Sequence, residues 1–437
     1  MVNRLLEPLH PRVCSAPTSV RLLGVFAAWR LLAYGYTFPA FYTSLFIYLC
    51  WIGAWLLNRE GVPVYSDFTN HFVAGSLALH GDTALIYVPA EFAKVQDALV
   101  GTGHVLYDKW PYPPSYFLLL APLAMLPYVT SYLTWEAASL LGFVAVVYLI
   151  VRRRPAVPLV LASPFTAWNF LIGQNGFLTA SLIGAALLAL ERQPVLAGVF
   201  IGCLTYKPQL GILFPAALVA GRQWKACISA ATTAAFLAGV STAVFGVGPW
   251  QAFPLEILGQ VGVNLNITSG VICRCQSVYG LIRFAHGDAV IAWLAQGITT
   301  GGIVAVVWLV WRSRVRFALK AATLSVGVLI VTPYAMAYDL AAIAIPVAFL
   351  AKDQLSRGLL RGEQTTLLAL FAASFCVFSG TRWGQVGALI SLTLLGLILR
   401  RAAYDGAYPA VAGGFRDSPE LPKSASPTFG SKPSCSI

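Results

Sequence analysis

Long apolar runs recur along this chain from Phe41 to Leu399, and they constrain its fold more than any other feature. A transmembrane helix needs roughly 20 predominantly apolar residues, and these runs continue far beyond any N-terminal signal. Of all residues 58% are apolar and 11% are charged, whereas a typical soluble domain has about 45–50% and about 25%. So few charges cannot solvate the surface of a soluble enzyme of this size. The sequence therefore predicts an all-α polytopic membrane protein.

The basic residues gather in short loops between the apolar runs, and they indicate how the chain is oriented. Cytoplasmic loops carry an excess of Lys and Arg. Residues 58–113 are instead rich in Asp and Glu, as expected on the opposite face. The basic loops are 152–154, 222–225, 312–320, 352–361 and 400–401. The net charge of +12 is therefore a topology signal, and no nucleic-acid partner is expected.

The chain divides into three predicted segments. Residues 1–38 form a cytoplasmic or interfacial N-terminal segment, residues 39–402 a transmembrane domain of about 12 helices, and residues 403–437 a disordered cytoplasmic tail. Extracytoplasmic loops are predicted at 58–113 and 247–287. The first loop is too long for an unstructured connection, and its pattern predicts short surface helices. Both termini are then cytoplasmic.

Several predicted spans are shorter than about 20 residues and contain prolines. Pro164, Pro208 and Pro215 interrupt apolar runs, and Ser115–Leu126 is a short apolar segment between prolines, which favours a shallow or re-entrant helix. Broken helices are tolerated in a membrane only where protein covers the freed backbone groups or where these groups line a cavity. The pattern predicts a site inside the helix bundle.

Asp67 is the strongest candidate for catalysis, because it follows the first span in the segment Tyr65-Ser66-Asp67-Phe68. A carboxylate at the membrane surface, flanked by aromatic residues, can serve as a general base. Tyr65, Asn70 and His71 lie beside it and are candidates for substrate binding. The alternative is that Asp67 caps a surface helix that starts near Asn70.

Lys207 is the main candidate for binding an anion. It lies at a helix break in an apolar region and precedes Pro208 and Gln209. Such a lysine is costly unless it meets an anion or reaches water, and a phosphate group is the obvious anion. The alternative is a lysine that extends to the outer lipid headgroups.

Four further residues lie at predicted outer ends of spans. Gln174 and Asn175 belong to a Gly-Gln-Asn-Gly turn whose amides can bind sugar hydroxyls, although the turn is also explained as a simple break between spans. Tyr338 and Asp339 follow Pro333, and Asp339 is a second outer carboxylate. All four are candidates for substrate binding.

Some charged residues and cysteines have no clear partner in the sequence. Arg274 and Arg283 in the second loop can help to neutralise a phosphate or can be solvated loop charges. Glu136 lies within a predicted span and needs a partner that the sequence does not identify. The eight cysteines show no zinc-like spacing, and a bridge between Cys273 and Cys275 would be strained. No metal and no cofactor is expected.

Four short motifs follow one another along the chain. They are Tyr65-Ser66-Asp67-Phe68, then Trp110-Pro111-Tyr112-Pro113-Pro114 before a Leu-Leu-Leu-Ala-Pro-Leu run, then Gly173-Gln174-Asn175-Gly176, then Ala197-Gly198 leading to Tyr206-Lys207-Pro208. In this order and at these spacings the chain resembles glycosyltransferase family 87 over residues 60–260, with a weaker echo at Pro333–Leu340. Members of that family are bacterial membrane enzymes of the GT-C class that use polyprenyl-phosphate sugars.

The resemblance implies roles for individual residues. In GT-C enzymes an Asp of the first extracytoplasmic loop deprotonates the acceptor hydroxyl, and Asp67 is the matching position. Ser66 precedes it and Thr69 follows it, so the D-x-D or E-x-D pattern that binds a divalent metal in relatives with pyrophosphate donors is absent. Lys207 or an arginine would stabilise the phosphate that leaves, and Tyr112 is a candidate for substrate binding.

The resemblance also implies a reaction and a location. A hexose, with mannose the first expectation, would pass with inversion from a polyprenyl-phosphate donor to an envelope glycolipid or glycan acceptor. The site would face the periplasm in a multi-pass protein of the bacterial inner (plasma) membrane, with membrane lipids as further partners. The alternative is a multi-span transporter or lipid flippase, for which inverted repeats between the halves would be expected. We see no such repeat, and a long acidic outer loop is more useful to an enzyme.

Overall fold

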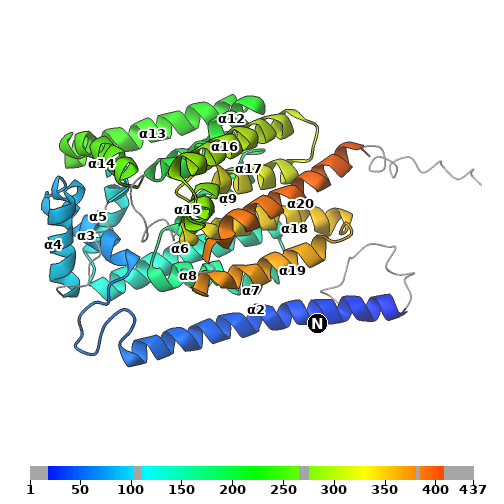
Figure 1. Ribbon diagram of the computed structural model, residues 1–437, viewed down its shortest axis with the longest axis horizontal. Helices are drawn as coiled ribbons and strands as arrows, with labels where there is room; N and C mark the ends of the chain where they lie inside the picture. Colours follow the sequence, from blue (N-terminus) through cyan, green and yellow to red (C-terminus); the bar gives the residue numbers. More distant parts are fainter. Residues whose placement is uncertain (1–17, 102–109, 265–274, 380–383, 408–437) are drawn as a thin grey trace, which may run out of the picture.

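The structure is a computed structural model that describes residues 18–101, 110–264, 275–379 and 384–407 (Figure 1). Within these ranges the secondary structure is helical, and the only extended pairing consists of isolated bridges. The long helices run along the longest axis of the molecule, while the short helices α3 (Asp67–His80) and α4 (Pro89–Val100) gather at one end. The predicted all-α fold is confirmed for the part of the chain that the structure describes.

Most of the remaining helices lie in the apolar runs, but α14 (Gly248–Asn264) and α15 (Val278–Phe284) lie within the predicted loop 247–287. In the first half they are α2 (Thr18–Ile52), α5 (Phe117–Ala124), α6 (Tyr128–Val151), α7 (Ala156–Leu161), α8 (Pro164–Ile172), α9 (Gly176–Ala189), α10 (Pro194–Cys203), α11 (Pro208–Gly211) and α12 (Phe214–Ala220). In the second half they are α13 (Trp224–Phe245), α14 (Gly248–Asn264), α15 (Val278–Phe284), α16 (Ala289–Arg312), α17 (Phe317–Val331), α18 (Ala344–Arg357), α19 (Glu363–Ser374) and α20 (Gly387–Ala407). Short 3-10 helices are η2 (Leu85–Tyr87), η3 (Pro114–Tyr116), η4 (Leu204–Tyr206), η6 (Ala337–Ile343), η7 (Phe375–Ser379) and η8 (Gly384–Val386).

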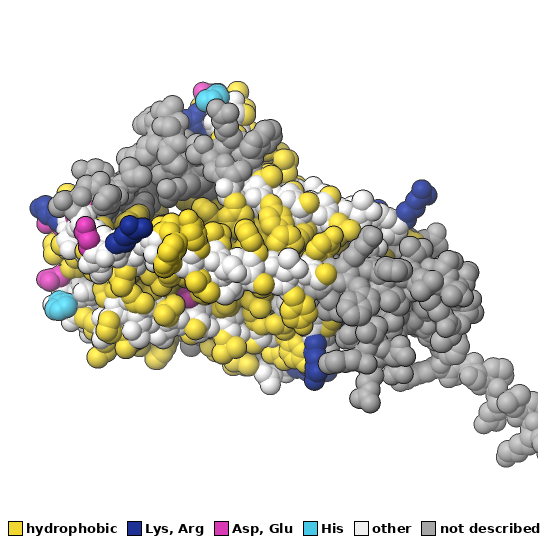
Figure 2. Space-filling view, turned by 90° about the horizontal axis from the view of Figure 1, so that it is seen from below, with side chains coloured by type: hydrophobic (Ala, Val, Ile, Leu, Met, Phe, Trp, Pro, Cys, Tyr) yellow, Lys and Arg dark blue, Asp and Glu magenta, His cyan; other side chains and the backbone are white. Residues whose placement is uncertain are grey.

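Four helices are long and apolar enough to cross a membrane, when the described residues are searched. They are Tyr128–Val151, Trp224–Phe245, Ala289–Arg312 and Gly387–Asp405. Six further apolar helices are shorter, so the predicted number of about 12 spans is not confirmed. On the face that Figure 2 shows, apolar side chains are spread over the middle of the described part, and most charged side chains lie towards its ends.

The short helices arise where proline or glycine interrupts the apolar runs. The apolar stretch 156–172, which contains Pro164, is divided into α7 and α8, and Pro164 is the first residue of α8. Pro208 likewise begins α11, and Pro215 lies in the first turn of α12. Proline suits the first helical turn, because its missing N–H would have no partner there. The predicted interruptions are therefore present, with proline at the start of each new helix.

Helix α2 runs without a break across residue 38, where the sequence predicted a boundary. It lies along one side of the bundle next to α7 (Figure 1). A Cβ atom at Gly35 would lie 3.2 Å from the Cβ atom of Pro158 in α7, so this glycine permits close contact between the two helices.

Two apolar clusters form the interior. The larger lies among α6, α9, α10, α12, α16, α17, α18 and α20. The smaller is rich in aromatic residues and joins α3, α4, α5 and the first half of α6 at the end of the molecule that holds the short helices. Tyr206, which directly precedes Lys207, belongs to this aromatic cluster. The candidate site therefore lies next to the smaller cluster.

Candidate functional site

A buried ion pair joins Lys207 and Asp339. Lys207 lies between η4 and α11, Asp339 lies in η6, and Nζ is 2.5 Å from Oδ1. Their side chains are only 2% and 1% exposed. A buried charge is stable only when it is paired and hydrogen-bonded. Lys207 thus does not extend to the lipid headgroups, which contradicts that alternative, and Asp339 compensates its charge.

Further contacts fix this pair in place. The Lys207 ammonium also donates to Asn175 Oδ1 at 2.9 Å and lies 4.5 Å from the centre of the Tyr338 ring. The second carboxylate oxygen of Asp339 accepts from the Met336 backbone N–H at 2.9 Å. Two of the three ammonium hydrogens are therefore used by protein oxygens, and the Asp339 carboxylate is bonded through both of its oxygens.

The Gly-Gln-Asn-Gly turn brings distant parts of the chain together. Gly173 has a φ of +74°, and a Cβ there would lie 2.5 Å from the Cβ of Phe68 in α3. A Cβ at Gly176 would lie 2.2 Å from the Tyr338 carbonyl oxygen in η6. A side chain at either position would collide with these neighbours, so both glycines are needed for close packing. The turn thereby connects the start of α3 to η6 and is more than a break between spans.

The amides of this turn are buried and in contact with other candidate residues. Gln174 Oε1 accepts from the Asn175 backbone N–H at 3.0 Å and from the Tyr112 hydroxyl at 3.4 Å. The Tyr338 phenol is within electrostatic reach of Tyr112, of Asp339 and also of Asp67. The structure thus brings together six predicted residues, and Asp67 directly precedes Phe68, which meets the same turn. The six are Tyr112, Gln174, Asn175, Lys207, Tyr338 and Asp339.

Asp67 is the first residue of α3 and does not cap it. The helix begins three residues before the predicted Asn70, and Ser66 holds the cap position. The Ser66 backbone N–H donates to Thr69 Oγ1 at 3.1 Å, as in a capping box. Asp67 is partly exposed. The alternative role of Asp67 as a helix cap is therefore wrong, and its carboxylate is not required for that purpose.

His71 lies one turn after Asp67 in the aromatic cluster. Its Nδ1 lies 3.2 Å from the Asp67 carbonyl oxygen, and its ring centre is 5.6 Å from that of Tyr116 and 5.8 Å from that of Trp135. Burial lowers the pKa of the imidazole to about 3. The hydrogen bond to the Asp67 carbonyl raises this pKa, and the positive charge of Lys207 lowers it. His71 is thus neutral near pH 7, and the Asp67 carbonyl favours the tautomer with its proton on Nδ1.

Several buried polar atoms in this region have no hydrogen-bond partner among the described residues. They include His71 Nε2, Trp110 Nε1, Tyr116 Oη, Trp135 Nε1, Asn175 Nδ2 and both carboxylate oxygens of Glu136. Buried polar groups in proteins are nearly always paired, so such a set indicates where water or a ligand completes the structure. The sequence analysis named His71, Asn175 and Glu136. Trp110 lies in the Trp-Pro-Tyr-Pro-Pro motif, whereas Tyr116 and Trp135 carried no signal in the sequence.

Other predicted residues have contacts outside this cluster. Asn70 Oδ1 accepts from Gln96 Nε2 of α4, and Tyr65 is partly exposed before α3. Arg283 Nη1 donates to the Gly287 carbonyl at 2.9 Å, in the turn that follows its own helix. Arg274 and Cys273 lie outside the described residues, and Cys275 is buried. No group of three or more His, Cys, Asp and Glu residues suited to a metal occurs in the part of the chain that the structure describes.

Comparison with known proteins assigns the family. The family model of glycosyltransferase family 87 matches residues 110–333, which is more than half of the chain. No curated protein and no solved structure matches this chain. The matched segment contains Tyr112, Gln174, Asn175 and Lys207. Asp67 and Asp339 lie outside the matched segment in the sequence but near these residues in the structure. With its apolar helices, the chain is a membrane protein that belongs to glycosyltransferase family 87.

Proposed function

We propose that this membrane glycosyltransferase transfers a hexose, with mannose the first candidate, from a polyprenyl-phosphate donor to a glycolipid or glycan acceptor. The reaction takes place on the periplasmic side of a bacterial plasma membrane. The observation that carries the proposal is the cluster of Lys207, Asp339 and Asn175 with Asp67 beside it. To displace a phosphate with a hydroxyl, an enzyme needs a carboxylate that takes the hydroxyl proton and a fixed cation that stabilises the leaving phosphate.

Asp67 acts as the general base. It takes the proton of the acceptor hydroxyl while the acceptor oxygen forms a bond to the anomeric carbon. The bond from that carbon to the phosphate oxygen breaks, and its electron pair stays on the leaving phosphate. One displacement inverts the anomeric centre. The partly exposed position of Asp67 at the start of α3 supports this role, because the carboxylate can reach an acceptor that arrives from water or from the membrane surface.

Lys207 stabilises the leaving phosphate without losing its carboxylate partner. An ammonium group has three hydrogens, and Asn175 and Asp339 accept two of them. The third is left for a phosphate oxygen. Asp339 pairs with the ammonium and holds it in position, so it acts as a positioning residue. Because the charge on the leaving oxygen grows as the bond breaks, this contact strengthens in the transition state.

The periplasmic orientation follows from the distribution of charge in the loops. The positive-inside rule places Arg152–Arg154 in the cytoplasm and Asp67 on the opposite side. Nucleotide sugars are not available there, and a lipid-linked donor is. A reporter that works only outside the cytoplasm should be active when fused after Asp97 and inactive when fused after Arg154. The reverse pattern would place Asp67 in the cytoplasm and contradict the lipid-linked donor.

The decisive test is transfer by the purified, full-length enzyme in liposomes. Polyprenyl-phosphate mannose, polyprenyl-phosphate glucose and a nucleotide-activated mannose are offered separately, with a lipid extract of the bacterial envelope as acceptor. We expect transfer from a polyprenyl-phosphate sugar, also in excess EDTA. Transfer from the nucleotide sugar alone would overturn the donor class. Activity that EDTA abolishes and manganese or magnesium restores would overturn the metal-free mechanism.

A further inference from the structure

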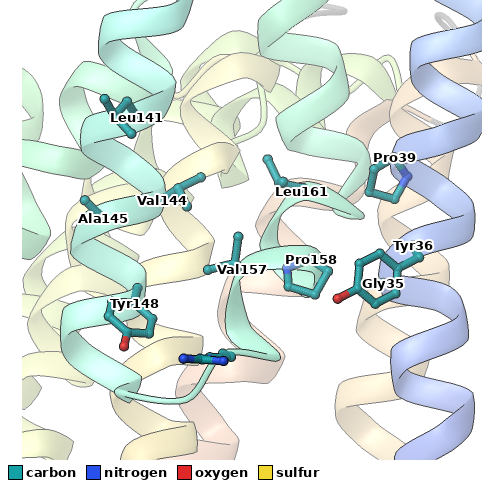
Figure 3. Close-up of a pocket in the computed structure, with 11 residues that line it drawn as sticks. Gly35, Tyr36, Pro39, Leu141, Val144, Ala145, Tyr148, Val157, Pro158 and Leu161 are labelled. Carbon is teal, nitrogen blue, oxygen red and sulfur yellow. The ribbon is translucent and has the colours of Figure 1, made fainter.

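A groove opens between α2, α6 and α7, in the half of α6 that lies away from the candidate site. Figure 3 shows α6 residues on one wall, α7 residues at the base and α2 residues on the other wall. Its volume is about 600 Å³, within the range of about 300–1,000 Å³ typical of ligand pockets. It follows α6 from Leu141 to Tyr148. The candidate site instead adjoins the opposite half of this helix, where Trp135 and Glu136 lie.

The lining is apolar along its length and has a single charged side chain. The apolar lining residues are Pro39, Leu141, Val144, Ala145, Val157, Pro158 and Leu161. Arg154 supplies the charge, and Tyr36 and Tyr148 supply the two phenols. Arg154 follows the C-terminal end of α6, which is Val151. A groove of this kind suits a ligand with a long apolar chain and an anionic head.

We propose that this groove binds one acyl chain of an anionic phospholipid, whose phosphate lies against Arg154. Ten residues separate Leu141 from Val151, which is about 15 Å along a helix. Half of a hydrocarbon core of about 30 Å has the same depth, so the groove takes one chain from headgroup level to the middle of the bilayer. The charge of Arg154 selects an anionic head over a zwitterionic one.

The occupant is a bulk phospholipid and not the glycosyl donor. The donor's phosphate belongs with Lys207, which contacts Asn175 and η6 and does not line the groove. The lining residues of the groove and the proposed site residues are different, so each proposal can fail without the other. Arg153 offers an internal control, because it is exposed beside Arg154 and does not line the groove.

The test is native mass spectrometry of the full chain with phosphatidylglycerol or phosphatidylcholine of matched acyl chains. We expect the wild type to retain one phosphatidylglycerol at concentrations at which phosphatidylcholine is lost. Arg154→Ala should weaken this retention by about fivefold, the usual effect of one basic residue near the surface. Arg153→Ala should retain it. Ala145→Trp should abolish it by filling the groove, while Leu149→Trp, at an exposed position of α6 outside the lining, should not.

Three results would overturn the proposal. Equal retention of the two lipids would remove the selective role of Arg154. Equal losses in Arg153→Ala and Arg154→Ala would show a general attraction of the basic cluster without a groove. Displacement of the bound phosphatidylglycerol by polyprenyl phosphate in the wild type, with retention of polyprenyl phosphate lost in Ala145→Trp and kept in Leu149→Trp, would show that the donor lipid occupies the groove. A transfer assay on the same variants separates these outcomes from a failure of the glycosyltransferase proposal.

Discussion

Two regions of this protein bury ion pairs, and they satisfy their polar atoms to different degrees. On α20 the Arg401 guanidinium bonds Asp353, both carboxylate oxygens of Glu363 and the Gly358 carbonyl. Asp353 also pairs with Arg316 at 2.6 Å. The buried side-chain N and O atoms of Arg401, Asp353 and Glu363 all have partners, and the one buried atom of this network without a hydrogen bond is Arg316 Nη1. Around Lys207, in contrast, buried atoms of His71, Tyr116, Asn175 and Glu136 have none.

This difference separates a structural contact from a binding site. A network in which both carboxylates and the central guanidinium are bonded fixes helices to one another and leaves little for a ligand to complete. The region around Lys207 is also held by an ion pair, yet it keeps unused donors and acceptors that water or substrate can complete. Burial of charge alone therefore does not identify the site, whereas unsatisfied polar atoms next to a fixed cation do.

The largest effect is expected at Asp67. Asp67→Asn keeps the shape of the side chain but removes the proton acceptor, so turnover should fall by about 10²–10⁴-fold. The fold should survive, because Ser66 holds the cap of α3. Initial rates of sugar transfer measure this, and Asp82→Asn, an exposed Asp of the same loop, serves as the matched control. Near-normal rates for Asp67→Asn would show that another group takes the proton.

Breaking the ion pair should affect both stability and transfer. Lys207→Met leaves Asp339 buried without its partner, which should cost about 3–5 kcal/mol of unfolding free energy and abolish donor binding. The double variant Lys207→Met with Asp339→Leu should regain much of this stability but no transfer. Thermal unfolding and donor binding are measured on both proteins. A double variant that transfers sugar would show that the pair is structural, like the network at Arg401.

The Arg401 network should respond in stability alone. Arg401→Met leaves Glu363 and Asp353 buried, although Arg316 remains beside Asp353. We therefore expect a loss near the lower end for buried pairs, about 3 kcal/mol. Turnover per folded molecule should stay unchanged. Chemical unfolding in detergent gives the first quantity, and rates normalised to folded protein give the second. A selective loss of turnover would mean that this end also takes part in the reaction.

The smallest effect is a pH dependence of stability that arises at His71. Its pKa is about 3 in the folded chain and about 6.5 when unfolded. Between these values the unfolded state binds more protons, so stability falls as the pH falls. Relative to neutral pH the loss at pH 5 is about 2 kcal/mol. His71→Phe should flatten this part of the profile. Parallel melting curves against pH for both proteins would contradict the neutral, buried imidazole.

The sequence allows most helices and some single residues of the buried cluster to be predicted, but not the way these residues meet. Apolar runs and prolines place the helix ends within a few residues, because both act locally along the chain. Gln174, Asn175 and Lys207 were also predictable, since a polar group in an apolar run requires an explanation. The pairing of Lys207 with Asp339 carries no local signal. The unpartnered aromatic donors Trp110 and Trp135 resemble ordinary core residues until burial and geometry are known.

The separation of the paired residues along the chain has a consequence for synthesis. Lys207 and Asp339 are 132 residues apart, so a ribosome that adds about 5–20 residues per second makes the carboxylate roughly 7 to 26 s after the ammonium. During that interval the front half enters the membrane with a cation whose final partner does not yet exist. The translocon can admit one such lysine at a cost of about 2.5–3.5 kcal/mol. The pair of Lys207 and Asp339 is thus completed late in biogenesis, when the back half of the chain is inserted against the front half.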